Sequence, residues 1–92
     1  MTKKELIGNI ALKTGYAKTT ITTILESALD SISETVTAGE TVYLRGFGSF
    51  SPRKHKERIA RNIKKMTSVI IPEHMVPHFK PYAEFKDKLN NN

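Results

Sequence analysis

One window of the sequence holds the whole excess of positive charge. Residues 45–65 carry eight Lys and Arg residues against one acidic residue, Glu57, whereas residues 1–44 carry a net charge of −1 and residues 66–92 a net charge of zero. Its part from about residue 53, continuing to about residue 67, has few apolar residues and cannot form a core. Strand-forming sequences flank the window, so we expect an ordered β-hairpin that projects from the body and binds a polyanion. The alternative is a solvated, disordered charge run.

The chain has 92 residues and no cysteine, which leaves little to stabilise it alone. Disulfides, thiolate nucleophiles and thiol-based metal sites are excluded. Packing against a partner subunit is the simplest replacement for the missing cross-links. Neither a membrane span of about 20 apolar residues nor a secretory signal is present in the sequence, so we expect a cytoplasmic protein.

Two helices are expected before the window. Thr2 and Glu5 fit a capping box, and Gly15 supplies a stop for the first helix. A second helix, from about residue 19 to about residue 36, carries a sustained apolar stripe. Two helices of this size cannot bury both of their stripes on each other, so they need a sheet, a second copy of the chain, or both. The stripe comprises Ile21, Ile24, Leu25, Ala28, Leu29, Ile32 and Val36.

The rest of the chain indicates strands and one more helix. Alternation predicts a strand over 42–45, a second strand from Ser49 into the basic window, and a third over 69–71 that Pro72 ends. Residues 77–81 are expected to be extended, residues 82–89 helical, and residues 90–92 frayed. The fold class is therefore α+β in one domain, 1–92: an N-terminal αα-hairpin, a three-stranded antiparallel sheet with a long protruding β-arm at about 53–68, and a short C-terminal helix.

An apolar residue at the expected tip of the arm is the second functional signal. Ile63 has no core within reach, but against DNA it could wedge between base steps, as minor-groove proteins do with Pro, Ile, Leu or Phe. Asn62 could reach minor-groove acceptors, and Arg61 favours a narrow, electronegative groove. Ile63 as an ordinary turn residue is the alternative.

Catalytic and metal motifs are absent from the sequence. His74 and His78 are four residues apart, but Pro77 breaks the helix that would align them, so we predict no metal site. No nucleophile motif, zinc-protease motif or phosphate-cradling glycine loop occurs, so we predict neither enzymatic activity nor a cofactor.

Three motifs resemble the bacterial HU/IHF (histone-like) family of DNA-bending proteins, over residues 1 to about 89. The resemblance implies an intertwined dimer whose two arms clasp DNA in the minor groove. The chain departs from the family pattern at His55, at Ile63, which replaces the intercalating proline, and after the tip, where Lys64-Lys65-Met66-Thr67 replaces a Thr-Gly turn. The motifs are Gly46-Phe47-Gly48-Ser49-Phe50, Arg58-Ile59-Ala60-Arg61-Asn62 and Val76-Pro77-His78-Phe79-Lys80-Pro81.

Residues and resemblance together predict a non-enzymatic, nucleoid-associated protein that bends or compacts duplex DNA with low sequence specificity. A homodimer is expected. A site-selective, IHF-like heterodimer subunit is one alternative, and an RNA-binding or ribosome-associated module is another. Ile63 is the predicted intercalating residue, and the predicted DNA-binding residues are Gly46, Arg53, His55, Arg58, Arg61, Asn62, Ile63, Lys64, Lys65, Lys80 and Lys86.

Overall fold

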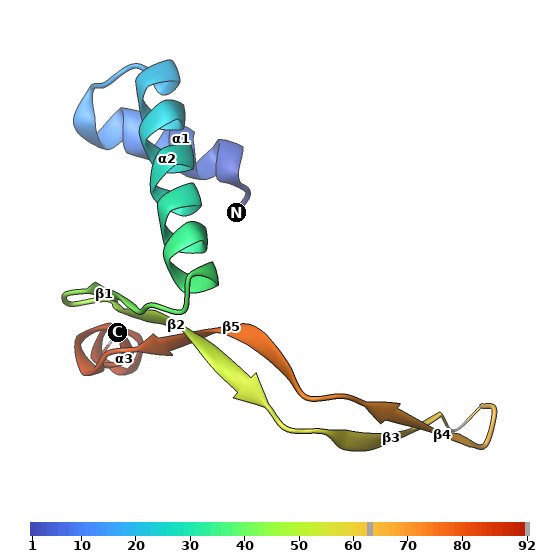
Figure 1. The fold of residues 1–92 in the computed structure, drawn as a ribbon. Helices are drawn as coiled ribbons and strands as arrows, with labels where there is room; N and C mark the ends of the chain where they lie inside the picture. The colour runs from blue at the N-terminus through green and yellow to red at the C-terminus, as the bar shows by residue number, and fades with distance from the viewer. Residues whose placement is uncertain (63, 92) are drawn as a thin grey trace. The chain divides into compact units, whose positions relative to one another are not determined.

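The computed structural model describes residues 1–62 and 64–91 of the chain (Figure 1). They form two compact units, Met1–Glu34 and Thr35–Asn92. The predicted wedge, Ile63, and the last residue of the expected frayed end, Asn92, lie outside the described residues.

The first unit is an αα-hairpin whose first helix is capped at both ends. Helix α1 spans Lys3–Thr14 and helix α2 spans Lys18–Thr37. The Thr2 hydroxyl accepts from the Glu5 amide at 3.2 Å and donates to the Glu5 carboxylate at 3.3 Å. At the other end Gly15 has a φ of 79°, and its amide donates to the Ala11 carbonyl at 2.9 Å. Both predicted helices are thus confirmed, and α2 begins one residue earlier than expected.

The core of this helix pair is small. Ile7 of α1 and Ile21 of α2 are 7% and 6% exposed, and an ion pair of 3.1 Å joins Lys3 Nζ to Glu26 Oε1. The apolar stripe of α2 is only partly covered: Ile24 is 64% exposed and Leu29 is 49% exposed, whereas Ile21 is buried and the remaining large side chains are half-buried. The single chain therefore leaves part of this stripe exposed to solvent.

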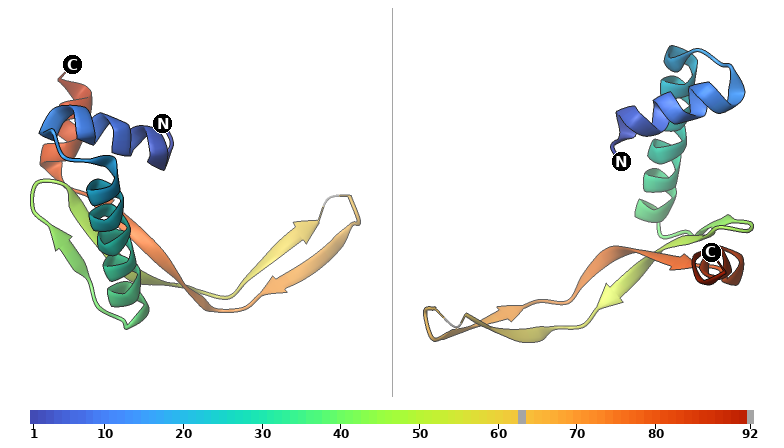
Figure 2. Two further views of the ribbon diagram at one scale, coloured as in Figure 1. Left: turned by 90° about the horizontal axis from the view of Figure 1, so that it is seen from above. Right: turned by 180° about the vertical axis from the view of Figure 1, so that it is seen from behind.

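The second unit is built on a three-stranded antiparallel sheet with the order β1-β2-β5. Strand β1 spans Val42–Leu44, β2 spans Gly48–His55 and β5 spans His74–Pro81, and helix α3 (Ala83–Asn90) follows β5. The long β2–β5 ladder begins with Gly48 opposite Pro81 and ends with His55 opposite His74. Strands β2 and β5 run side by side along this ladder in both views of Figure 2.

A glycine and three phenylalanines attach α3 to the sheet. The ring centroids of Phe47 and Phe85 are 4.9 Å apart, and those of Phe47 and Phe79 are 5.2 Å apart. A Cβ atom on Gly48 would lie 2.5 Å from the Lys80 carbonyl oxygen and 2.6 Å from the Phe79 ring, so only glycine fits there. The Gly-Phe motif is therefore a packing device as well as a turn.

The third strand of the sheet is not the one that the sequence indicates. Residues 69–71 belong to β4 (Thr67–Ile71), which pairs with β3 (Arg58–Asn62) in a separate two-stranded sheet, and β5 completes the three-stranded sheet. Strand β5 tolerates its prolines because it is an edge strand, and Pro77 lies opposite Pro52.

Helix α3 also differs from expectation at its end. It includes Asn90, whose side-chain amide donates to the Lys86 carbonyl at 3.0 Å, and the Asn91 amide donates to the Asp87 carbonyl at 3.0 Å. The helix therefore ends one residue after the predicted Leu89, and the fraying of residues 90–92 stays a prediction.

Candidate nucleic-acid interface

A two-stranded arm leaves the β1-β2-β5 sheet within the second unit. We define the arm as residues 53–76. Its inner part is the end of the β2–β5 ladder, and its outer hairpin is the β3–β4 pair, with a register from Arg58 opposite Ile71 to Asn62 opposite Thr67. Residues 56–57 and 72–73 belong to no strand, so the ladder is interrupted between the two parts. In Figure 1 the outer hairpin continues from β2 and β5 and points away from β1 and α3.

The cations of the basic window are exposed and mostly unpaired. Lys54 forms a salt bridge of 2.6 Å with Glu73. Along the described parts of the chain, six of the eight cations have no carboxylate within 4.0 Å and lie exposed: Arg45, Arg53, Lys56, Arg58, Arg61 and Lys64. Their charge is available to an external anion, because no internal partner neutralises it.

The strands distribute these charges over both faces of the arm. Alternation along a strand places Arg53 and His55 on one face of β2 and Lys54 on the other. Arg58 and Arg61 are an odd number of residues apart, so they lie on opposite faces of β3. The predicted tip cations, Lys64 and Lys65, lie in the turn between β3 and β4.

An exposed apolar pair on the outer hairpin was not among the predicted site residues. Ile59 lies opposite Ile70 in the β3–β4 register, and the two side chains are 71% and 63% exposed. Period two places Ile59 on the same face as Arg61. The sequence did contain a signal for this face: Ile59 stands two positions before Arg61, and residues two apart in a strand lie on the same face. This face therefore combines exposed apolar surface with a cation.

The predicted site residues outside the arm gather at the other end of the sheet. Gly46 lies in the exposed β1–β2 turn with a φ of 81°, and exposed Lys80 lies opposite Ser49. Lys86 is exposed on α3, which packs against this end through Phe85. These three residues therefore lie at the opposite end of the β2–β5 ladder from the outer hairpin.

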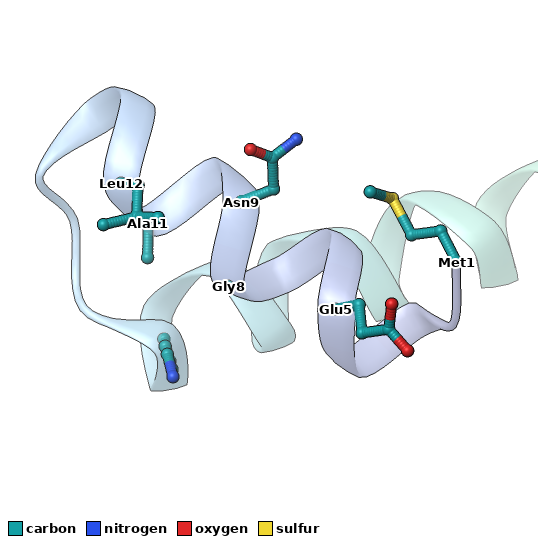
Figure 3. A pocket seen from close by; sticks show the side chains of 7 residues that line it. Met1, Glu5, Gly8, Asn9, Ala11 and Leu12 are labelled. Carbon is teal, nitrogen blue, oxygen red and sulfur yellow. The ribbon is translucent and has the colours of Figure 1, made fainter.

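A hollow of about 610 Å³ in the first unit shows no catalytic arrangement. Its wall is mostly α1, and the Asn9 amide and the Glu5 carboxylate do not point toward one another (Figure 3). Across residues 1–62 and 64–91, no three His, Asp or Glu side chains gather into a metal-binding cluster. In the same residues, no helix has the length and apolar character to cross a bilayer.

A β-ribbon of exposed cations, most of which have no carboxylate partner among the described residues, is typical of a nucleic-acid-binding protein. The family model described as "Bacterial DNA-binding protein" matches residues 1–90. The chain belongs to this family, which contains the HU and IHF proteins. The resemblance found in the sequence is thereby confirmed.

Relatives of known name match over nearly the whole chain. The chain is 43% identical over 89 residues to the DNA-binding protein HU of Thermotoga maritima, covering 97% of this chain and 99% of that protein. It is 43% identical over 91 residues to integration host factor subunit beta of Alkalilimnicola ehrlichii, covering 98% of this chain and 91% of that protein.

A solved structure of an HU protein also matches the chain over its whole length. A cocrystal structure of Anabaena HU with DNA matches with a TM-score of 0.92 and 37% identity and covers 100% of both chains. The predicted α+β fold is therefore confirmed.

Proposed function

We propose that the chain is a non-enzymatic architectural protein that binds and bends duplex DNA through the minor groove, with little sequence preference, in the bacterial nucleoid. One observation carries the proposal: Arg58 and Arg61 of the outer hairpin are exposed, and no carboxylate of the described residues lies within 4.0 Å of them. Bending a site of roughly 20–30 base pairs costs on the order of 1–6 kcal/mol, which phosphate contacts must exceed. The HU protein that was crystallised with DNA has the same fold over its whole length.

Within this proposal the arm residues have separate tasks. Arg53, Arg58 and the tip lysines neutralise phosphates, since Lys and Arg side chains bind the backbone without reading sequence. Arg61 enters the groove, Asn62 contacts base edges and Ile63 unstacks a base step. Gly46, Lys80 and Lys86 hold the flanking DNA against the body, and His55 contributes at the base of the arm.

We further propose that the working unit is a dimer with an intertwined core. Among the described residues only Ile7 and Ile21 are buried apolar side chains, and no side chain is fully buried. So small a core cannot offset the conformational entropy lost on folding. A second copy that covers the α2 stripe supplies the missing apolar burial, so we propose a homodimer.

The subunit name of the IHF relative favours a second possibility, a site-selective heterodimer. Identity to HU and to this IHF subunit is the same, 43%. The two possibilities differ in specificity: an affinity ratio between a cognate and a random duplex above roughly 10³ indicates the site-selective protein, and a smaller ratio indicates the non-selective one.

The function is tested with a panel of nucleic acids at one salt concentration: linear duplex DNA, nicked duplex DNA, cruciform DNA and an RNA duplex of the same sequence. We expect the purified chain alone to bind each DNA more tightly than the RNA. We also expect the duplex ends to approach on binding, measured by fluorescence energy transfer. Tighter binding to the RNA duplex would contradict the proposal and favour the RNA-binding module, because A-form duplexes are recognised by shape and 2′-hydroxyls.

A further inference from the structure

Two histidines lie opposite each other at the end of the β2–β5 ladder. His55 is the last residue of β2 and His74 the first of β5, and they are Cα partners in the antiparallel register. Their ring centroids are 5.5 Å apart, with 70° between the ring planes, and both residues are exposed. The pair stands where the arm's ladder is interrupted.

The separation of the two rings fits a single bound ion. Zn–N bonds are about 2.0–2.1 Å long, so two imidazoles on one tetrahedral ion have centroids about 5 Å apart. Small rotations of two exposed side chains reach that distance from 5.5 Å. By contrast, His74 and His78, which the sequence spacing singles out, are four strand residues or roughly 13 Å apart along β5, too far to share an ion.

The His74 ring makes the backbone hydrogen bond that is common in metal-binding histidines. His74 Nδ1 lies 2.9 Å from the Pro72 carbonyl oxygen. A carbonyl only accepts, so Nδ1 carries the proton and the lone pair is on Nε2. Histidines that bind metals usually donate their other ring N–H to a carbonyl or carboxylate, which fixes the tautomer.

We propose that His55 and His74 form a two-histidine site for a divalent transition-metal ion such as Zn²⁺ or Ni²⁺. Imidazole nitrogen suits these ions, and water completes the coordination, since the neighbouring Glu73 carboxylate is engaged by Lys54. The ion would join β2 to β5 beside the interruption and add positive charge at the base of the arm. This site goes beyond the proposed DNA binding and does not depend on it.

The site is tested by titrating the full chain with ZnCl₂ alone, using calorimetry and the NMR signals of the imidazole nitrogens. We expect one ion per chain, with the nitrogens of His55 and His74 shifting and those of His78 unmoved. His55→Gln and His74→Gln should each weaken binding at least tenfold. The matched control, His78→Gln, should bind as the unsubstituted chain does, because His78 lies opposite Ser51.

Two results would overturn the site: no saturable binding, or binding that His78→Gln weakens as much as His55→Gln and His74→Gln do. Either would mean that the ring contact is packing alone. DNA binding measured with and without a chelator keeps the two proposals separate. DNA binding that persists in chelator leaves the proposed function intact whether or not the site exists.

Discussion

At the scale of single residues, the two glycines of the Gly-Phe motif are needed for different physical reasons. Gly46 has a φ of 81°, a conformation that side chains with a Cβ rarely adopt. Gly48 is needed because β5 and the Phe79 ring leave no room for a Cβ. The close approach at Gly48 depends on a pairing partner some thirty residues later, so it could not be predicted from the local sequence.

Gly48→Ala should lower the free energy of unfolding by about 1–3 kcal/mol, because the added methyl group overpacks the β2–β5 junction. Urea denaturation followed by circular dichroism measures this loss. Gly8→Ala is the control: nothing lies within 4 Å of its Cβ position in α1, so helix propensity should stabilise the chain by up to about 1 kcal/mol. Equal stability of Gly48→Ala and the unsubstituted chain would refute the packing role.

Ile63 is tested through function, because its position lies outside the described residues. If Ile63 wedges between base steps, Ile63→Ala should reduce bending more than it weakens binding, because charge contacts remain while unstacking is lost. Energy transfer between dyes on the duplex ends reports bending, and a gel shift reports affinity. A parallel loss of both would argue against the wedge.

At the scale of elements, the turn of the outer hairpin stores backbone strain. Met66 has a φ of 50° and is the one non-glycine residue with positive φ among those described. A left-handed conformation costs a residue with a Cβ roughly 1–2 kcal/mol. The sequence also departs from the family pattern in this turn, because Lys64-Lys65-Met66-Thr67 stands in place of a Thr-Gly turn.

Met66→Gly should therefore slow amide hydrogen exchange in β3 and β4, by a factor on the order of 5 for about 1 kcal/mol of relieved strain. Exchange in α1 and α2 serves as the internal reference and should not change. Faster exchange in the hairpin of the variant would show that the methionine side chain stabilises the turn.

The elements also show which features a sequence can predict. Both long helices were predicted because their signals are local: the Thr2 cap, the Gly15 stop and the apolar stripe. The third strand was misplaced because its identity depends on strand order, which local patterns do not contain. The His55–His74 pairing was missed for the same reason.

At the scale of the whole molecule, the exposed α2 stripe determines the assembly that we propose. Leu25→Asp should abolish folding and association together, because it places a charge in the apolar surface that two chains would share. Circular dichroism and analytical ultracentrifugation measure the two properties. For the unsubstituted chain we expect a melting temperature that rises with protein concentration.

Glu26→Gln is a matched control for Leu25→Asp, because Glu26 is exposed and its ion pair with Lys3 lies on the surface, where such pairs contribute about 0–1 kcal/mol. The control should remain a folded dimer. A Leu25→Asp chain that is folded and monomeric would refute the shared core.

The sequence predicted where the charge of the candidate site lies, but it did not predict which side chains share a face of the arm. Counting charges located the arm, because a core cannot absorb eight cations in 21 residues. The apolar pair of Ile59 and Ile70 emerged only with the β3–β4 register, since neither residue is unusual by itself.

The central claim is that exposed cations of the arm bind DNA phosphates, and the salt dependence of DNA affinity tests it. Each phosphate contact contributes about −0.9 to the slope of log K against log salt, so Arg53→Gln/Arg58→Gln, which removes four of the proposed contacts per dimer, should flatten the slope by roughly 3–4. Lys4→Gln/Lys13→Gln removes the same charge from α1 and should leave the slope nearly unchanged. An equal effect of the two variants, or a slope near zero for the unsubstituted chain, would contradict the account.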